Sequence, residues 1–466
     1  MSVPHPPVAA NARTDADLFG HPRGLAFLFA TEMWERFSYY GMRALLVLYM
    51  TRYLLLPPQA GAVIGLATFR SLLETIFGPL DLQPLASQIY GFYTGLVYLT
   101  PIFGGLIADR LLGQRRTVII GAALMAIGHF MMAFEPLFLL ALFVLILGNG
   151  AFKPNISTQV GALYAAGDRR RDRAFSIFYV GINLGAFLAP LVCGTLGEEY
   201  GWHYGFAAAG VGMTIGLLTY LYASRTLPPD QFTRARQSAH RERLRAADWR
   251  AIAGLLVLFF PVTFFWATYE QQGNTIVLWA DGFTSRSIDL WVWRGEIPVT
   301  WFQALNPFMI FAFTPFVVAL WRRQGTREPS TVAKMAIGCF LNAASFLVLF
   351  AAAHFAGGDK ASWLWLFAFF VVLTIGELYL SPTSLSLVTK VAPPGVLSMM
   401  MGVWLATSFT GNFLAGYLGS FWSAMDKGRF FLMCALIVAM AGGIIALLNR
   451  PLRAAIAENQ SIGNPA

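Results

Sequence analysis

Charged side chains within one apolar stretch are the residues of this sequence best suited to do chemistry. Residues 31–43 read TEMWERFSYYGMR, and Glu32, Arg36, Tyr40 and Arg43 recur at spacings of three and four. This spacing predicts one face of a helix, with Glu35 beside it. A charge at the bilayer centre costs roughly 2.5–3.5 kcal/mol on insertion scales, so four charges on one spanning helix indicate a hydrated cavity. A structural Glu32–Arg36 ion pair explains two of these charges and leaves the other two unexplained.

Three further ionic residues fall within apolar segments. Lys153 precedes Pro154 in GNGAFKPNIS, Glu270 lies in FWATYEQQGN, and Glu377 lies in LTIGELYLSP. A buried lysine needs a carboxylate partner or loses its proton. Carboxyl groups that switch between paired and unpaired states can bind and release protons, so we predict ion pairs that open and close. A purely structural ion network is the alternative.

Polar and aromatic residues in the same segments are candidates for the wall of a binding pocket. The polar ones are Asn183, Gln303, Asn306 and Asn412, and the aromatic ones are Tyr39, Tyr40, Tyr93, Trp266 and Trp404. An Asn or Gln amide both donates and accepts, so it can bind a peptide bond or join two helices. Asp109, in GGLIADRLLGQRR, is expected at a turn, as a candidate for gating.

Long apolar segments must position these residues. Of the 466 residues 57% are hydrophobic and 12% are charged, against about 25% charged in an average soluble domain. Twelve segments have the length of a membrane-spanning helix: 25–55, 85–107, 117–134, 137–159, 175–195, 204–224, 252–279, 301–321, 332–354, 363–388, 399–420 and 430–448. We therefore predict an all-α membrane protein that contacts the lipid bilayer over most of its length.

The basic residues predict the orientation. With twelve spans, 23 of the 33 Lys and Arg residues fall on the side of the two tails, seven on the other side and three within helices. Because cytoplasmic loops are enriched in basic residues, both termini are expected in the cytoplasm. This distribution also explains the net charge of +9 without any nucleic acid.

The longest charged stretch divides the spans six and six. We predict a cytoplasmic tail at 1–24, a six-helix bundle at 25–224, a basic linker at 225–250, a second six-helix bundle at 251–450 and a second tail at 451–466. Two related bundles would hold a substrate between them near the bilayer midplane. The N-terminal residues contain no apolar core, so no signal peptide is expected.

The ordered motifs resemble the proton-dependent oligopeptide transporter (POT/PTR) family of the major facilitator superfamily. Residues 32–41 fit the family pattern ExxERFxYYG, and 104–117 are similar to the superfamily's cytoplasmic signature. FKPNIS at 152–157, FYVGINLGAFLAP at 178–190, WFQALNP at 301–307 and GELYLSPTSLSLVTKVAP at 376–393 are similar to further family segments. The resemblance implies two six-helix bundles and proton-coupled uptake of di- and tripeptides.

The resemblance also implies roles for single residues. Glu32, Glu35 and Arg36 match the positions linked to proton coupling. Arg36 and Lys153 match the basic side that receives the peptide carboxylate, and Glu377 matches the acid that receives the amine. The ion pairs linked to gating are Arg43–Glu270 and Lys153–Glu377, and the remaining pocket positions are Tyr39, Tyr40, Tyr93, Asn183, Trp266, Asn306, Trp404 and Ser408.

Two departures from the family are visible. Many bacterial members insert two helices between the bundles, and the linker here is too short for them. Animal members have a functional histidine in the second helix, where this chain has Gly91. Proton coupling would therefore depend on carboxylates.

The remaining expectations concern class and context. No nucleophile–base pair, metal cluster or repeated pore loop is visible, so an enzyme and a channel are disfavoured and no metal or cofactor other than the proton is expected. The alternative is a proton-coupled carrier of a peptide-like drug, an amino acid derivative, a sugar or nitrate. We expect a monomer in the inner membrane of a bacterium.

Overall fold

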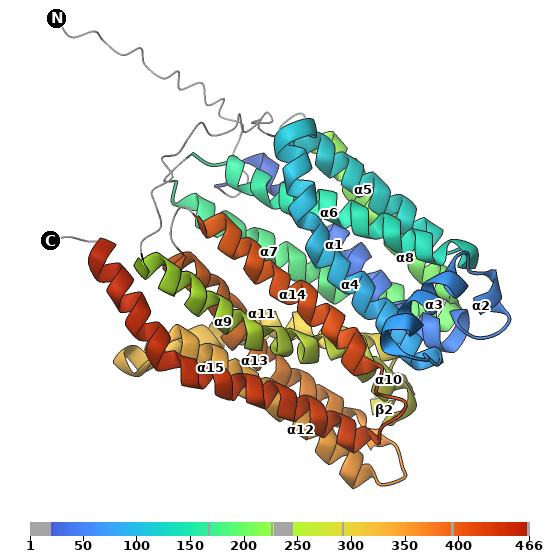
Figure 1. The fold of residues 1–466 in the computed structure, drawn as a ribbon. Coiled ribbons are helices and arrows are strands. Elements are labelled where there is room, and N and C mark those ends of the chain that lie inside the picture. Colours follow the sequence, from blue (N-terminus) through green and yellow to red (C-terminus); the bar gives the residue numbers. More distant parts are fainter. Residues whose placement is uncertain are drawn as a thin grey trace, which may run out of the picture.

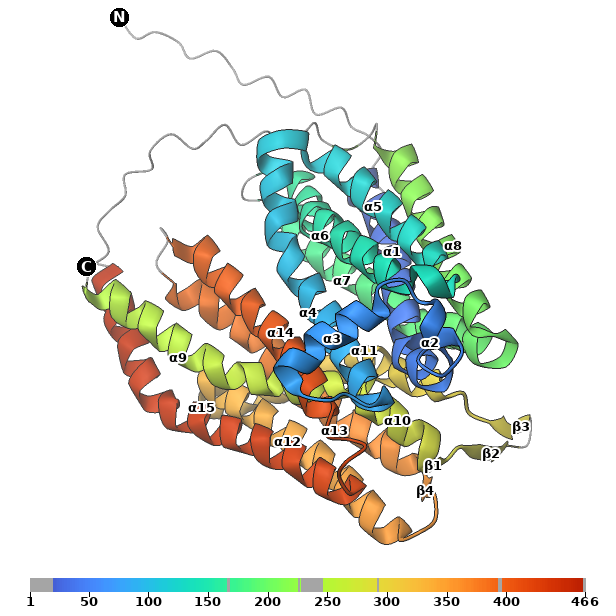
Figure 2. The ribbon, with the colours of Figure 1, turned by 45° about the vertical axis from the view of Figure 1, so that its right-hand side comes forward.

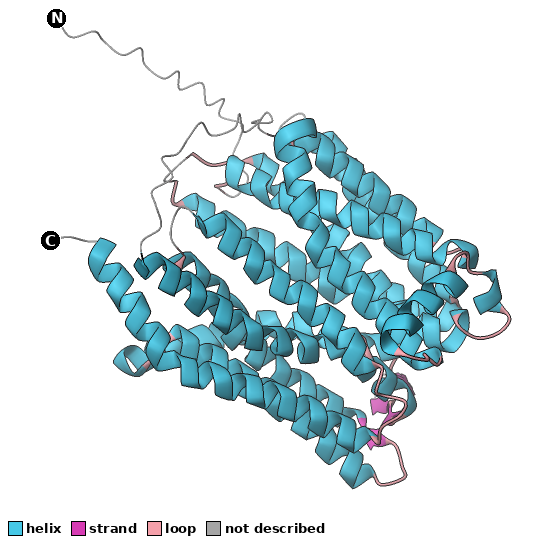
Figure 3. Cartoon of the chain, in the orientation of Figure 1, coloured by secondary structure: helices cyan, strands magenta, loops and turns pink. Residues whose placement is uncertain are grey.

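The protein is a bundle of long helices with four very short strands at one end (Figure 3). The computed structural model describes residues 20–165, 168–224, 227, 246–290, 293–392 and 396–463. Twelve helices of this described part have 18 residues or more: α1 (Arg23–Tyr49), α4 (Leu82–Ile107), α5 (Gln114–Met131), α6 (Phe138–Ala162), α7 (Arg170–Ala189), α8 (Trp202–Ala223), α9 (Ala246–Tyr269), α11 (Phe302–Gln324), α12 (Thr331–Ala356), α13 (Trp363–Val391), α14 (Leu397–Gly419) and α15 (Lys427–Gly463). They coincide with the twelve predicted spans, which confirms the predicted fold class.

The helices form two groups, each around its own apolar core (Figures 1 and 2). In the first group α1 packs on α7 and α8, and α5 and α6 pack on each other. In the second group α12 packs on α13 and α15, and α9 packs on α14 and α15. The groups meet where α4 lies against α14 and α7 lies against α11.

Helix α1 differs in composition from most of the other spans. Nine helical segments in the described part of the chain are long and apolar enough to cross a membrane by composition, and α1 is not among them. Every 18-residue window of α1 contains at least three of its charged residues. Because this helix is nevertheless buried inside the first bundle, its charges must be satisfied by protein or water.

The seventh span is interrupted. Helix α9 ends at Tyr269, a 3₁₀ turn follows at Glu270–Gly273, and α10 continues over Thr275–Gly282. Such a break is tolerated at membrane depth where the backbone is buried in protein or lines a cavity. It places Glu270 at the break between α9 and α10, which the sequence did not predict.

Short elements collect at the end of the molecule that we call the far end, opposite the starts of α1 and α9 (Figure 2). They are α2 (Gln59–Ala62), α3 (Leu66–Phe77), the hairpin of β2 (Ser287–Leu290) and β3 (Trp293–Glu296), and the pairing of β1 (Thr284–Ser285) with β4 (Ala361–Ser362). No element was predicted from the sequence for these segments.

Residues 1–19, 225–226 and 228–245, which include most of the first predicted tail and of the predicted linker, lie outside the described residues. Helix α9 begins at Ala246, so the last five residues of the predicted linker are helical. Helix α15 continues to Gly463 and includes most of the predicted C-terminal tail.

Close backbone approach joins the two bundles through α4 and α14. A Cβ atom added at Gly91 would lie 2.7 Å from the Cα atom of Gly416. No side chain fits at such a contact without moving a helix. This explains in physical terms why the chain has no second-helix histidine at this position.

Glu198 makes the most extensive set of hydrogen bonds between the bundles at the far end. It lies in the first bundle, in the π-helical turn Leu196–Tyr200 that follows α7. Its Oε2 accepts from the backbone N–H of Val299 (2.9 Å), and its Oε1 accepts from the N–H (2.8 Å) and hydroxyl (2.7 Å) of Thr300. A carboxylate at this position caps the N-terminus of the 3₁₀ turn Val299–Trp301, which runs directly into α11, and interacts favourably with the helix dipole.

Three other contacts join the two bundles near Glu198, and we call this set of contacts the far-end seam. Trp301 Nε1 donates to Thr195 Oγ1 at 2.8 Å, and Arg52 Nε donates to Asp281 Oδ2 at 2.6 Å. Gln83 Nε2 donates to the carbonyl oxygen of Gly419 at 2.9 Å. In this structure the two bundles are therefore closed against each other at the far end.

We predict that Glu198→Ala opens this seam. The three lost hydrogen bonds involve a charged acceptor, and one such bond contributes about 1.5–3 kcal/mol, so the ratio of open to closed molecules should rise about tenfold or more. Spin labels at Ile64→Cys and Phe355→Cys, both exposed near the far end, report the distance between the bundles. The native cysteines are buried and compete little for the label.

The matched control is Glu199→Ala, because Glu199 is adjacent and exposed. Its distance distribution should equal that of the parent protein. Equal distributions for Glu198→Ala and Glu199→Ala would contradict the assigned role of Glu198.

Candidate functional site

A cavity of about 350 Å³ lies between the two bundles, within the range of small-molecule sites. Its wall includes residues of α1, α4, α6 and α7 from the first bundle and of α9, the 3₁₀ turn Glu270–Gly273, α11, α13 and α14 from the second. Thirteen of the predicted site residues line it: Glu32, Arg36, Tyr40, Arg43, Lys153, Asn183, Trp266, Glu270, Gln303, Asn306, Glu377, Trp404 and Ser408. The structure thus brings together residues that are up to 376 positions apart in the chain.

Arg36 is the centre of the charge cluster on α1. Its Nε lies 3.1 Å from Glu32 Oε1 and also donates to Glu35 Oε2. All three side chains are at least 95% buried. Arg36 Nη2 and Glu32 Oε2 have no hydrogen-bond partner among the described residues. Both residues line the cavity, so each has one polar atom without a protein partner beside the space for a bound molecule.

Glu377 on α13 forms the acidic group of the opposite wall. Asn306 Nδ2 donates to Glu377 Oε2 at 2.8 Å and lies 3.1 Å from Thr374 Oγ1. Tyr269 Oη donates to Asn306 Oδ1 at 3.3 Å. The amide of Asn306 therefore orients the carboxylate, and no ion pair in the described part of the chain includes Glu377.

Arg43 and Glu270 form an ion pair across the two bundles. Arg43 Nε also donates to Tyr90 Oη at 2.9 Å, and both members of the pair are more than 90% buried. The 3₁₀ turn at Glu270–Gly273 directs the carboxylate toward α1. A Cβ atom at Gly273 would lie 2.3 Å from Tyr90 Oη, so the glycine allows this approach.

Lys153 lies over an aromatic ring instead of beside a carboxylate. Its Nζ is 4.5 Å from the ring centroid of Tyr98. The predicted Lys153–Glu377 ion pair is not among the ion pairs of the described residues. A cation–π contact leaves the ammonium group free to take an anionic partner.

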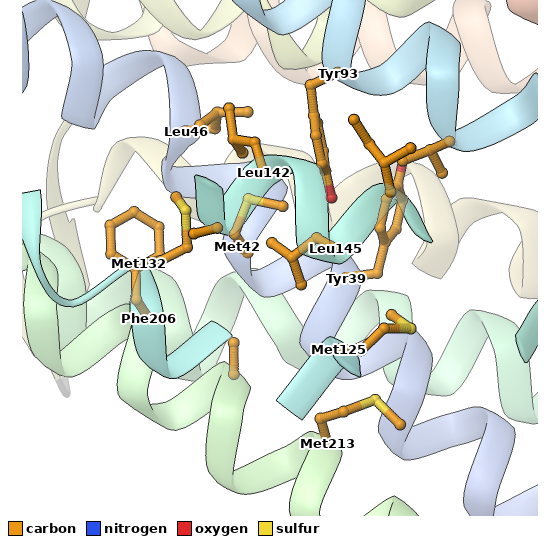
Figure 4. Packing of buried hydrophobic residues seen from close by; sticks show 14 of the residues in the cluster. Tyr39, Met42, Leu46, Tyr93, Met125, Met132, Leu142, Leu145, Phe206 and Met213 are labelled. Atoms are coloured by element: carbon orange, nitrogen blue, oxygen red, sulfur yellow. The ribbon is translucent and has the colours of Figure 1, made fainter. Parts of the chain in front are cut away.

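Five predicted site residues do not line the cavity. Asn412 is 1% exposed within α14, and its Nδ2 donates to the carbonyl oxygen of Ser408 at 2.8 Å. Tyr39 and Tyr93 are 3% exposed and pack within the core of the first bundle, near Met42 and Leu145 (Figure 4). Glu35 is fully buried behind Arg36. Asp109 is exposed in a turn of π-helix, Ala108–Leu112, at the end opposite the far end.

Sequence analysis missed several lining residues. Tyr98, Tyr179, Tyr269 and Gln272 contribute polar groups to the wall, and Ser157 and Ser381 add hydroxyls. Tyr98 is five residues beyond Tyr93 in α4, so the two rings point in different directions around the helix. The available signal was the i, i+5 pair of tyrosines, which does not reveal which ring faces the partner bundle.

A second cavity, of about 330 Å³, lies between α7, α11 and α13. Its wall consists of apolar and aromatic side chains such as Phe187, Trp301 and Phe308. It contains no ionic group, so the chemistry of the charged residues belongs to the first cavity.

Comparison with known proteins identifies the family. The model of the POT family matches residues 115–232 and 229–433. The chain belongs to the POT family. The two matched stretches meet at 229–232, inside the linker, and together they include most of both bundles.

The relatives of this POT family member match it over nearly its whole length. A "Di-/tripeptide transporter" of Lactococcus lactis subsp. cremoris is 32% identical over 503 residues, covering 94% of this chain and 97% of the relative. A solved "peptide transporter POT", bound to sulfate, has a TM-score of 0.80 and 31% identity and covers 93% of this chain and 96% of its own. A POT family transporter bound to 5-aminolevulinic acid has a TM-score of 0.81 and 27% identity, covering 93% of this chain and 98% of its own. The family is one of transporters, not of enzymes.

The buried Arg43–Glu270 pair generates a stability prediction. Arg43→Gln or Glu270→Gln alone should lower the free energy of unfolding by about 3–5 kcal/mol, because each leaves one buried charge unpaired. The double variant should recover much of this loss. Titration with a denaturing detergent in mixed micelles measures the difference.

The control is Arg294→Gln, which breaks the exposed Arg294–Asp289 pair. Exposed pairs contribute about 0–1 kcal/mol, so its effect should be small. Losses that simply add in the Arg43/Glu270 double variant would show that the two side chains do not interact.

Proposed function

We propose that this transporter is a proton-coupled symporter that imports di- and tripeptides across the inner membrane of a bacterium. The observation that carries the proposal is the division of charge in one chamber: the cations Arg36 and Lys153 lie on one bundle, and Glu377 lies on the other. A short peptide is a zwitterion whose two ends differ in the same way. The name of the Lactococcus relative, a di-/tripeptide transporter, supports this choice of substrate.

The geometry supports one orientation of the bound peptide. The peptide carboxylate contacts Arg36 Nη2 and the Lys153 ammonium. Among the described residues, Arg36 Nη2 has no hydrogen-bond partner and Lys153 takes part in no ion pair. The peptide amine contacts Glu377, which Asn306 already orients. Side chains of the peptide meet Tyr40, Trp266 and Trp404, whose broad faces tolerate different shapes.

Proton coupling follows from competition for Arg36. Glu32 and Glu35 both pair with the Arg36 guanidinium. Protonation of one of these carboxylates therefore frees a hydrogen-bond donor of Arg36. The released donor binds the peptide carboxylate, and peptide and proton therefore favour each other's binding. By linkage this effect is reciprocal.

The Arg43–Glu270 pair and the far-end seam act as gates in this proposal. The excess of basic residues near the tails supports a cytoplasmic location of both termini, so the far end faces outward. The structure then corresponds to a state closed toward the outside. Alternating access then requires the Glu198 hydrogen bonds and the Arg43–Glu270 ion pair to break while the two bundles close on the cytoplasmic side. A monomer is sufficient for this cycle.

Recognition of two charged ends extends to other small amphoteric molecules. A related POT family transporter was solved with 5-aminolevulinic acid, which has an amine and a carboxylate but no peptide bond. Carriage of such an amino acid derivative is the second candidate function. Competition of 5-aminolevulinic acid with labelled dialanine distinguishes a carrier of both from a carrier of peptides alone.

Uptake of labelled dialanine into proteoliposomes tests the function directly. An imposed inward proton gradient should drive accumulation, whereas Glu32→Gln and Glu35→Gln should each abolish accumulation and retain part of the exchange of internal for external peptide. No accumulation by parent protein that remains folded would refute the function. Normal accumulation in both variants would refute the role of the two glutamates.

The orientation of the peptide is tested by Glu377→Gln. Loss of the charged partner of the amine should weaken binding of dialanine about tenfold or more, because a hydrogen-bonded charge contributes about 1.5–3 kcal/mol. N-acetyl-dialanine has no charged amine, so its weaker binding should change little. Equal losses for the two ligands in equilibrium binding measurements would rule out the Glu377–amine contact.

A further inference from the structure

The GNG sequence ahead of Lys153 places a polar residue, to which no role has yet been given, inside the first bundle. Gly148 and Gly150 let α6 approach its neighbours: a Cβ atom at Gly148 would lie 2.6 Å from Met125 Cγ, and one at Gly150 would lie 2.6 Å from Thr100 Cβ. The residue between them, Asn149, is 1% exposed. It lies four positions before Lys153 and so on the same face of α6.

Asn149 contacts the carboxylate that does not reach the cavity. Its Nδ2 donates to Glu35 Oε1 at 3.1 Å, and Glu35 Oε2 accepts from Arg36. Both oxygens of Glu35 therefore receive a donor. Glu32 differs, because only its Oε1 lies near Arg36, and its Oε2 has no partner among the described residues. Glu32 lines the cavity and Glu35 does not.

We infer that Asn149 is a positioning residue for proton coupling, which holds Glu35 ionised as the fixed partner of Arg36 and leaves Glu32 to take the exchangeable proton. An ionised carboxylate accepts at both oxygens, and a fully buried one needs both acceptors satisfied. Asn149 supplies the second donor. This inference deepens the proposed function and rests on it.

The charged and titratable surroundings of Glu35 are consistent with this division. Arg36 and Glu32 on α1, Lys153 on α6 and Tyr93 on α4 are titratable groups close enough to interact with its carboxylate. Only Arg36 and Asn149 donate hydrogen bonds to it in the described part of the chain. Removal of Asn149 therefore leaves Arg36 as the single donor, and Glu35 competes with Glu32 for the proton.

The test compares accumulation with exchange of labelled dialanine in proteoliposomes. Asn149→Ala should lower gradient-driven accumulation about tenfold and change exchange less than about twofold, since exchange does not require net proton release. The isosteric variant Asn149→Asp, which keeps the size of the side chain, should show the same split. The control is Asn155→Ala: Asn155 is equally buried in α6, but its amide donates to the backbone oxygens of Ala151 and Gly104. Both activities of this control should stay within about twofold of the parent values.

A double-mutant cycle of melting temperature with Asn149→Ala and Glu35→Gln separates this inference from the proposed function, because it does not depend on transport. The effect of Asn149→Ala on melting should be clearly smaller in the Glu35→Gln background, where the acceptor is neutral. The same effect in both backgrounds would overturn the inference even if peptide transport is confirmed. Parallel losses of accumulation and exchange in Asn149→Ala and Asn149→Asp would also overturn it.

Discussion

The burial of ionic groups in a low-dielectric chamber is the constraint on which the structure depends. Seven ionisable side chains lie in or next to the cavity wall: Glu32, Glu35, Arg36, Arg43 and Glu270 are buried, and Lys153 and Glu377 are half-buried. Four of them are acids and three are bases, so one proton makes the cluster electrically neutral. Unbalanced charge is expensive at this depth, and ion pairs are stable only with good geometry and satisfied hydrogen bonds. A zwitterionic ligand adds charges of both signs without altering the net balance.

Several features of the fold follow from this constraint. The first helix has to be surrounded by the other helices of its bundle, because lipid cannot solvate its charges. The break after Tyr269 brings Glu270 to Arg43, and Gly273 gives Tyr90 the space to support the pair. The far-end seam holds the two halves of the cluster together on one side. Because the Arg43–Glu270 pair joins the two bundles, the proposed rocking of the bundles requires this pair to break.

The sequence predicted the parts of this account that depend on charge and hydropathy. The twelve spans and the ionic residues that line the chamber could be found because a charge inside an apolar segment is conspicuous. The aromatic wall could not be found with the same accuracy. Tyr93 and Tyr98 both lie in an apolar helix, and only packing against the second bundle shows that Tyr98 faces the cavity. Asn149 was hidden for a similar reason, since its partner is 114 residues away in the sequence. The short helix α3 and the β2–β3 hairpin were missed because their segments are shorter than a membrane span.

The central claim is that peptide and proton share one charge cluster, and proton uptake on peptide binding tests it most directly. Calorimetry of dialanine binding in buffers of different ionisation enthalpy counts the protons taken up by the detergent-solubilised protein. The account predicts an uptake approaching one proton per bound peptide at a pH where the cluster is deprotonated, and a marked reduction in Glu32→Gln. Tight binding of dialanine with no proton uptake at any pH between about 5 and 8 would contradict it.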